Sequence, residues 1–244
     1  MGHYRKDPDL EFLQLAEEDD LRVLTHYLTH DEKGEIRWTE SLTSDSLYKD
    51  NADKPDRHKK CWQRIAAELQ HFGGDSIVNK FRRKGVLYRE IIADICSKQN
   101  IKLKQYFKVD EAEGRLLKHI TKEAMKKMSE EEKVDFLNEL GIDSSMSGAL
   151  EDFLTKMVSG SAATVLLSSI IAKIVARQLA VSAAAQVAGQ VGSRGLLAFA
   201  GPIGIAFGTL LLIPSITGSA YRVTLPAAIQ IAYMRQKGLS QNYF

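Results

Sequence analysis

The chain is poor in the features that mark secreted or lipid-modified proteins. It has two cysteines, Cys61 and Cys96, too few for a disulfide framework, which favours a reducing compartment. The amino terminus, MGHYRKDPDLEF, lacks the apolar core and cleavage site of a secretory signal. Lys6 stands where a myristoylation signal on Gly2 needs Ser or Thr. We therefore expect a cytoplasmic protein.

Acidic residues are absent from the last part of the chain. Asp152 is the last of them, and the basic residues beyond it are Lys156, Lys173, Arg177, Arg194, Arg222, Arg235 and Lys237. Residues 153–244 therefore carry +7, and because the whole chain carries +2, residues 1–152 carry −5. Such a region suits contact with anionic lipid, where each nearby cation contributes about 1 kcal/mol. The alternative is a buried helical layer with a few exposed cations.

Alternating, strand-like runs are also scarce, and most apolar residues recur at helical spacing. The stripes are Leu21, Leu24 and Leu28; Cys61, Trp62, Ile65 and Leu69; and Tyr88, Ile91, Ile92 and Ile95. We predict an all-α multi-helix bundle with an apolar Gly/Ala-rich C-terminal helical hairpin. The composition divides it into an acidic N-terminal part, 1–140, and an apolar, basic C-terminal part, 149–244, joined by the linker GIDSSMSG.

Several helix ends carry recognisable signals. Gly73-Gly74 predicts a helix stop, and Ser129 with Glu132 has the spacing of a capping box. In the closing helix, Thr224 is a candidate cap, Pro226 fits the first turn, and Gly238 predicts the end.

The longest uncharged stretch runs for 27 residues, 195–221, more than the roughly 20 needed to cross a bilayer. Pro202 and Pro214 interrupt it and leave 203–213 as the longest unbroken segment, which favours a hairpin. The choice between burial in protein and insertion into a membrane surface stays open. The candidate membrane-facing residues are Lys173, Arg177, Arg194, Phe199, Gly204, Phe207 and Gly208.

No catalytic motif is present. The chain has no phosphate-binding loop, nucleophile elbow or dinucleotide fingerprint, and we predict no catalytic residue, cofactor or metal site. His26 and His30, and likewise His58 and Cys61, have metal-ligand spacing, but neither set repeats, so we expect ordinary helix-surface residues. The basic clusters are balanced by acidic residues, which speaks against nucleic acid.

The segment GGDSI, residues 73–77, resembles the attachment motif of peptidyl carrier proteins, in which the serine carries a phosphopantetheine arm. The following NKFRRKG is short and basic rather than a long apolar helix. We favour the simpler interpretation that Gly73 and Gly74 end one helix and Asp75 caps the next.

Two longer strings, HKKCWQRIAAELQHFGGDSIVNKFRRKGVLYREIIADICSK and TGSAYRVTLPAAIQIAYMRQ, resemble the YaaW family of uncharacterised bacterial proteins. DLEFLQLAEEDDLRVLTHYLTHDEKG resembles its amino-terminal module. The resemblance implies a remote grouping with ubiquinol–cytochrome c chaperones and no catalytic residues. The matching positions that we take as a candidate partner surface are Gly73, Gly74, Asp75, Ser76, Arg82, Tyr88, Arg89, Tyr221 and Arg222.

These observations lead to three functional hypotheses. The first is a non-enzymatic binding or chaperone-like protein at or near the cytoplasmic membrane, peripheral to the inner membrane, that docks on anionic lipid and engages a protein client or partner. The second is a membrane-inserting effector of the toxin or defence type. The third is a carrier-like role through Ser76. The sequence does not predict the oligomeric state.

Overall fold

All regular structure that the computed structural model describes is helical. The description covers residues 3–31, 34–74, 85–126, 128–139, 155, 164–169 and 220–240. Within these ranges the one β feature is an isolated antiparallel bridge between His30 and Ile36. The all-α prediction is confirmed. The predicted linker 141–148, the hairpin and the apolar stretch as far as residue 219 lie outside the described residues.

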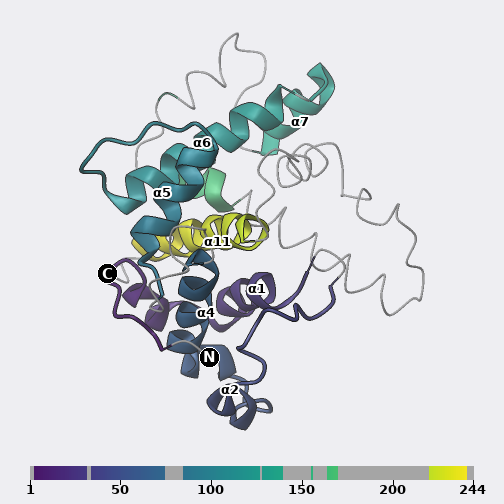
Figure 1. The fold of residues 1–244 in the computed structure, drawn as a ribbon. Coiled ribbons are helices and arrows are strands. Elements are labelled where there is room, and N and C mark those ends of the chain that lie inside the picture. The colour runs from purple at the N-terminus through teal and green to yellow at the C-terminus, as the bar shows by residue number, and fades with distance from the viewer. Residues whose placement is uncertain are drawn as a thin grey trace.

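The described helices follow one another along the chain with short connections (Figure 1). They are a 3-10 helix, η1 (Glu11–Leu15), and the α-helices α1 (Glu18–Thr29), α2 (Ser46–Asp50), α3 (Arg57–Lys60), α4 (Trp62–Gly74), α5 (Tyr88–Lys98), α6 (Val109–Met125), α7 (Glu130–Glu139) and α11 (Tyr221–Ser240).

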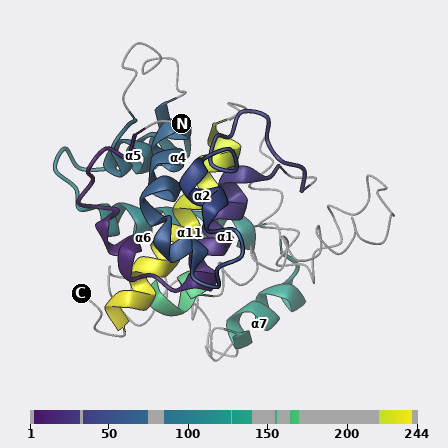
Figure 2. The same ribbon diagram turned by 90° about the horizontal axis from the view of Figure 1, so that it is seen from below.

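Helix α11 is the centre of this arrangement. It contacts α1, α4, α5 and α6, and Figures 1 and 2 show it threaded among them. Its Ala227, Ala228 and Ile231 are completely buried. A helix that is apolar on all sides is buried on all sides, and its alanines allow neighbouring helices to approach closely. The end of the chain therefore completes a core built mainly from its beginning.

The predicted apolar stripes form that core. Leu21, Leu24 and Leu28 of α1 have no exposed surface, and the stripes of α4 and α5 join the same cluster, with Trp62 at its edge. Burial of each large apolar side chain contributes about 1.5–3 kcal/mol. The division into an N-terminal and a C-terminal part stays a prediction, although α11 packs in the core of the first.

The helix ends agree with the predictions in two places and differ in one. Glu132 accepts a hydrogen bond from the Ser129 amide at 2.7 Å, and Ser129 Oγ accepts one from the Glu132 amide at 3.3 Å, which confirms the capping box. Helix α4 ends at Gly74, as predicted. Helix α11, in contrast, begins at Tyr221 rather than near Thr224, and it continues to Ser240.

The early start of α11 has a packing cause. Tyr221 and Val223 are buried, so tertiary contacts stabilise a turn that precedes Pro226. Pro226 consequently lies inside the helix. In the part of the chain that is described, no helix combines the length and the hydrophobicity needed to cross a membrane.

Candidate functional site

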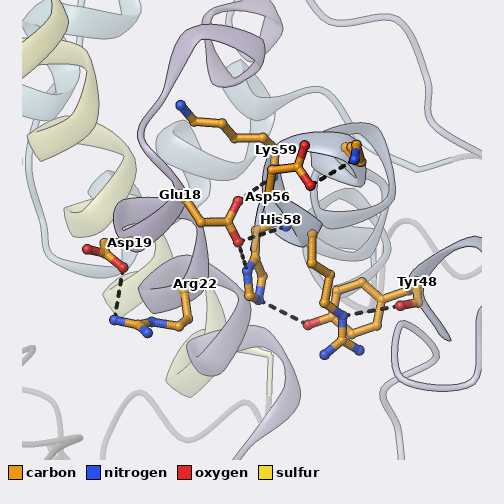
Figure 3. Close-up of polar contacts among 9 residues, drawn as sticks. Glu18, Asp19, Arg22, Tyr48, Asp56, His58 and Lys59 are labelled. Carbon is orange, nitrogen blue, oxygen red and sulfur yellow. Dashed lines mark hydrogen bonds and ion pairs between the residues drawn. The ribbon is translucent and has the colours of Figure 1, made fainter. Parts of the chain in front are cut away.

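A polar cluster joins the start of α1 to α2 and α3, and Figure 3 shows its side chains. The Glu18 carboxylate accepts hydrogen bonds from the amides of His58 and Lys59, each at 3.0 Å. These amides lie in the first turn of α3, where N–H groups have no partner within the helix. Burial opposes the charge of Glu18, but the amides and the His58 side chain outweigh burial and lower the pKa of Glu18.

His58 extends this cluster to Tyr48. Its Nδ1 lies against Glu18, and its Nε2 is 3.2 Å from the Tyr48 hydroxyl. With the Nδ1 proton directed at Glu18, the Nε2 of a neutral imidazole accepts from Tyr48. Arg57 covers the other side of Tyr48, with its guanidinium carbon 3.6 Å from the ring centroid and its Nε donating to the Tyr48 carbonyl.

The order carboxylate, imidazole, hydroxyl is that of a catalytic relay, but the hydroxyl belongs to a buried side chain. Tyr48 is 4% exposed, and burial raises the pKa of its phenol. A protonated, covered phenol is a poor nucleophile. The cluster therefore acts as a fastening between α1, α2 and α3.

The two pairs with metal-ligand spacing have other partners. Cys61 is buried, and its thiol donates to the Leu47 carbonyl. His26 and His30 are half-buried and stacked, with ring centroids 4.3 Å apart, rather than lying free on a helix surface. Within the described ranges, no group of three or more potential ligands gathers.

A second polar cluster lies in the core itself. Glu113 of α6 is 1% exposed and accepts hydrogen bonds from the Tyr88 hydroxyl at 2.9 Å and from Arg235 Nε at 2.9 Å. Arg235 also donates to the Asp9 carbonyl at 2.7 Å, and its guanidinium covers the Phe12 ring. This cluster joins η1, α5, α6 and α11.

Burial sets the electrostatics of the second cluster. It raises the pKa of Glu113, against the effect of Arg235. Burial also opposes the charge of Arg235, but Glu113 outweighs it and raises the pKa of Arg235. The sequence analysis missed this pair. The available signal was the position of Glu113 among Ala112, Leu116 and Leu117, on the apolar side of α6.

The predicted partner-surface residues fall into different environments. Tyr88 and Tyr221 are buried, and Tyr221 Oη accepts a hydrogen bond from Gln99. Arg89 is exposed and donates to the Phe107 carbonyl, and Arg222 is exposed near the start of α11. Gly73 packs against α5, and Gly74 closes α4.

The remaining predicted residues are not among those described. These are Asp75, Ser76 and Arg82 of the candidate partner surface, and the candidate membrane-facing residues Lys173, Arg177, Arg194, Phe199, Gly204, Phe207 and Gly208. Both sets of residues stay predictions.

Comparison with known proteins gives the chain relatives over nearly its whole length. Residues 4–38 match a family described as "Domain of unknown function (DUF3944)". UPF0174 protein YaaW of Escherichia coli (strain K12) is 37% identical over 234 residues, 96% of each chain. A UPF0174 protein of Helicobacter pylori (strain J99 / ATCC 700824) is 32% identical over 246 residues, 98% of this chain and 95% of the relative.

None of these names states an activity, and none supports the grouping with ubiquinol–cytochrome c chaperones. No solved structure matches the chain. The identity to YaaW and its relatives nevertheless extends from the acidic helices through α11. The chain therefore belongs to the UPF0174 family that includes YaaW.

Proposed function

We propose that this protein is a non-enzymatic binding protein that docks on an anionic membrane surface through its C-terminal region and engages a protein partner. The observation that carries the proposal is the charge distribution. Residues 153–244 contain seven basic residues and no carboxylate, and they include the longest uncharged stretch of the chain.

The structure separates the basic residues of this region by role. Arg235 pairs with Glu113, and Lys237 pairs with Glu17 and Asp20. These two cations hold α11 in the acidic part of the molecule. The proposal assigns contact with lipid to Lys173, Arg177 and Arg194, which precede α11 along the chain.

Attraction of this kind has a clear physical basis. Each cation near an anionic leaflet contributes about 1 kcal/mol, and apolar side chains that enter the interface add to it. The attraction is screened by salt. Binding should therefore require anionic lipid and weaken as the ionic strength rises.

Vesicle flotation tests the proposal. The full chain should float with vesicles that contain one-third phosphatidylserine at low salt, and not with pure phosphatidylcholine vesicles. Lys173→Glu with Arg177→Glu should weaken flotation at least tenfold. A chain that fails to float with anionic vesicles at low salt would contradict the proposal. Release of an encapsulated dye would instead favour a membrane-inserting effector.

A further inference from the structure

The loop between α5 and α6 combines positive charge with an exposed aromatic ring. Lys102, Lys104 and Lys108 are exposed, and Tyr106 between them is 87% exposed. Residues 99–109 contain no Asp or Glu. Among the described residues, no carboxylate forms an ion pair with any of these three lysines. We call Lys102, Lys104, Tyr106 and Lys108 the basic loop.

The backbone of the loop is braced, so its outward side chains have a fixed direction. Ile101, Leu103 and Phe107 pack against the core, and the lysines alternate with them on the outer side. Arg89 Nη1 donates to the Phe107 carbonyl at 2.8 Å, and Arg115 Nη1 donates to the Lys102 carbonyl at 3.2 Å. Figures 1 and 2 show the loop at the outer edge of the molecule, beside α5 and α6.

The beginning of the loop lies next to the beginning of α11. Gln99 donates to the Tyr221 hydroxyl, and Lys98 Nζ is 5.6 Å from the centroid of the Tyr221 ring. Residues 153–219, which have no carboxylate, therefore lead into the described fold beside the residue at which the loop starts. Positive charge from both parts of the chain meets at this point.

From the unpaired lysines, the exposed tyrosine and the braced backbone, we infer that the basic loop is a membrane-docking element that binds an anionic lipid surface. The inference rests on the proposed function and adds a contact in the acidic part of the chain, where the sequence predicted none. Lysines attract anionic headgroups, and a tyrosine ring is suited to the interface because it is apolar with a polar tip.

A second exposed aromatic residue provides a contrast. Trp38 is 94% exposed, but its described neighbours along the chain include Asp31, Glu35 and Glu40, and only Arg37 is basic. An anionic surface repels that loop and attracts the loop around Tyr106. Trp38 is therefore the matched control for removal of an exposed aromatic side chain.

The test measures partitioning of the full chain onto vesicles with one-third phosphatidylserine at low salt. The triple variant Lys102→Gln, Lys104→Gln, Lys108→Gln should bind about a hundredfold more weakly, because each lysine contributes about fivefold. Tyr106→Ala should weaken binding as well. The matched variant Lys49→Gln, Lys54→Gln, Lys59→Gln, with the same change in charge on and around α2 and α3, and Trp38→Ala should bind like the wild type.

The possible results separate this inference from the proposed function. If the wild type fails to bind, the proposed function fails and the inference falls with it. If the wild type and the loop triple variant bind equally, the loop is not a docking element, although the proposed function stands. Loop-dependent binding of a single-stranded oligonucleotide, without vesicle binding, would overturn both in favour of nucleic acid.

A spectroscopic readout tests direct contact. In a Trp38→Phe, Trp62→Phe background, Tyr106→Trp places the single tryptophan at the loop tip. Its emission should move to shorter wavelengths with anionic vesicles and not with phosphatidylcholine vesicles. Co-flotation without this shift would show that the protein binds through another surface. Unchanged circular dichroism and thermal unfolding would establish that each variant folds.

Discussion

Burial determines the charge state of individual residues in this protein. Glu18 and Glu113 occupy similar depths of structure, but Glu18 accepts two amide hydrogen bonds that lower its pKa, whereas burial raises the pKa of Glu113. His26 is the clearest case among the histidines. Burial, with His30 and Arg37 nearby, lowers the pKa of His26 from 6.5 to about 4.

His26 should make stability depend on pH. A folded-state pKa below the unfolded value means that the unfolded chain binds more protons between about pH 6.5 and pH 4, so stability falls as the pH falls through this window. With a discount for partial exposure, we expect His26 to account for a loss of about 1 kcal/mol between pH 7 and pH 5. Urea unfolding at the two pH values measures it.

The His26→Gln variant should lose correspondingly less stability over the same interval. His3→Gln is the control, because His3 is exposed and should leave the pH dependence unchanged. An equal pH dependence in the wild type and His26→Gln would refute the assignment.

At the scale of elements, the contact between α4 and α5 requires a glycine. A Cβ atom on Gly73 would lie 2.5 Å from Ile91 Cγ1 and 2.7 Å from Val86 Cγ2. These distances are far inside van der Waals contact. Gly73 therefore ends α4 and at the same time allows α5 to pack closely against it.

Gly73→Ala should destabilise the protein despite the better helix propensity of alanine. Overpacking typically costs 1–3 kcal/mol, and the propensity gain offsets about 1 kcal/mol, so we expect a net loss of about 1 kcal/mol in the free energy of unfolding. In an Ile91→Val background, which removes the Cδ1 atom, the loss should be smaller. A Gly73→Ala protein that is more stable than the wild type would contradict this account.

At the scale of the whole molecule, the two ends of the chain hold each other in place. Arg235 and Lys237 of α11 bind Asp9, Glu17 and Asp20 near the amino terminus. Asp7 accepts a hydrogen bond from the Tyr88 amide at the start of α5. The segment that matches the domain of unknown function is thus part of a core that the last helix completes.

The Arg235–Glu113 pair should be a strong contributor to this closure. Arg235→Met leaves the carboxylate of Glu113 buried without its cation, and we expect a loss of about 3–5 kcal/mol in guanidinium unfolding. Adding Glu113→Gln should recover part of the loss, because the neutral amide still accepts from Tyr88. Lys237→Met, which removes a more exposed cation from the same helix, should cost about 1 kcal/mol or less. Equal losses for Arg235→Met and Lys237→Met would disprove the special role of Arg235.

The sequence was sufficient for features that depend on near neighbours along the chain. Helical spacing identified the stripes of α1, α4 and α5, and local hydrogen-bonding chemistry identified the capping box at Ser129. The start of α11 was predicted late because burial of Tyr221, a contact with distant α5, stabilises the first turn.

The partners of the polar residues could not be predicted in the same way. Glu113 and Arg235 are 122 positions apart, and Glu18 and His58 are 40 apart. Pairing at such separations depends on how the helices pack. The basic loop left a local signal, a run without carboxylates from 99 to 109, but its meaning depends on which side chains point outward.

The sequence by itself determined the helical class, the apolar faces and the concentration of positive charge after Asp152, because these follow from residue type and spacing. Only the tertiary structure decided that α11 lies at the centre, that Arg235 and Lys237 bind the acidic part, and that Lys102, Lys104 and Lys108 have no carboxylate partner among the described residues. The reason is physical: burial and ion pairing depend on distances in space, and these are set by the packing of helices that are remote in the chain.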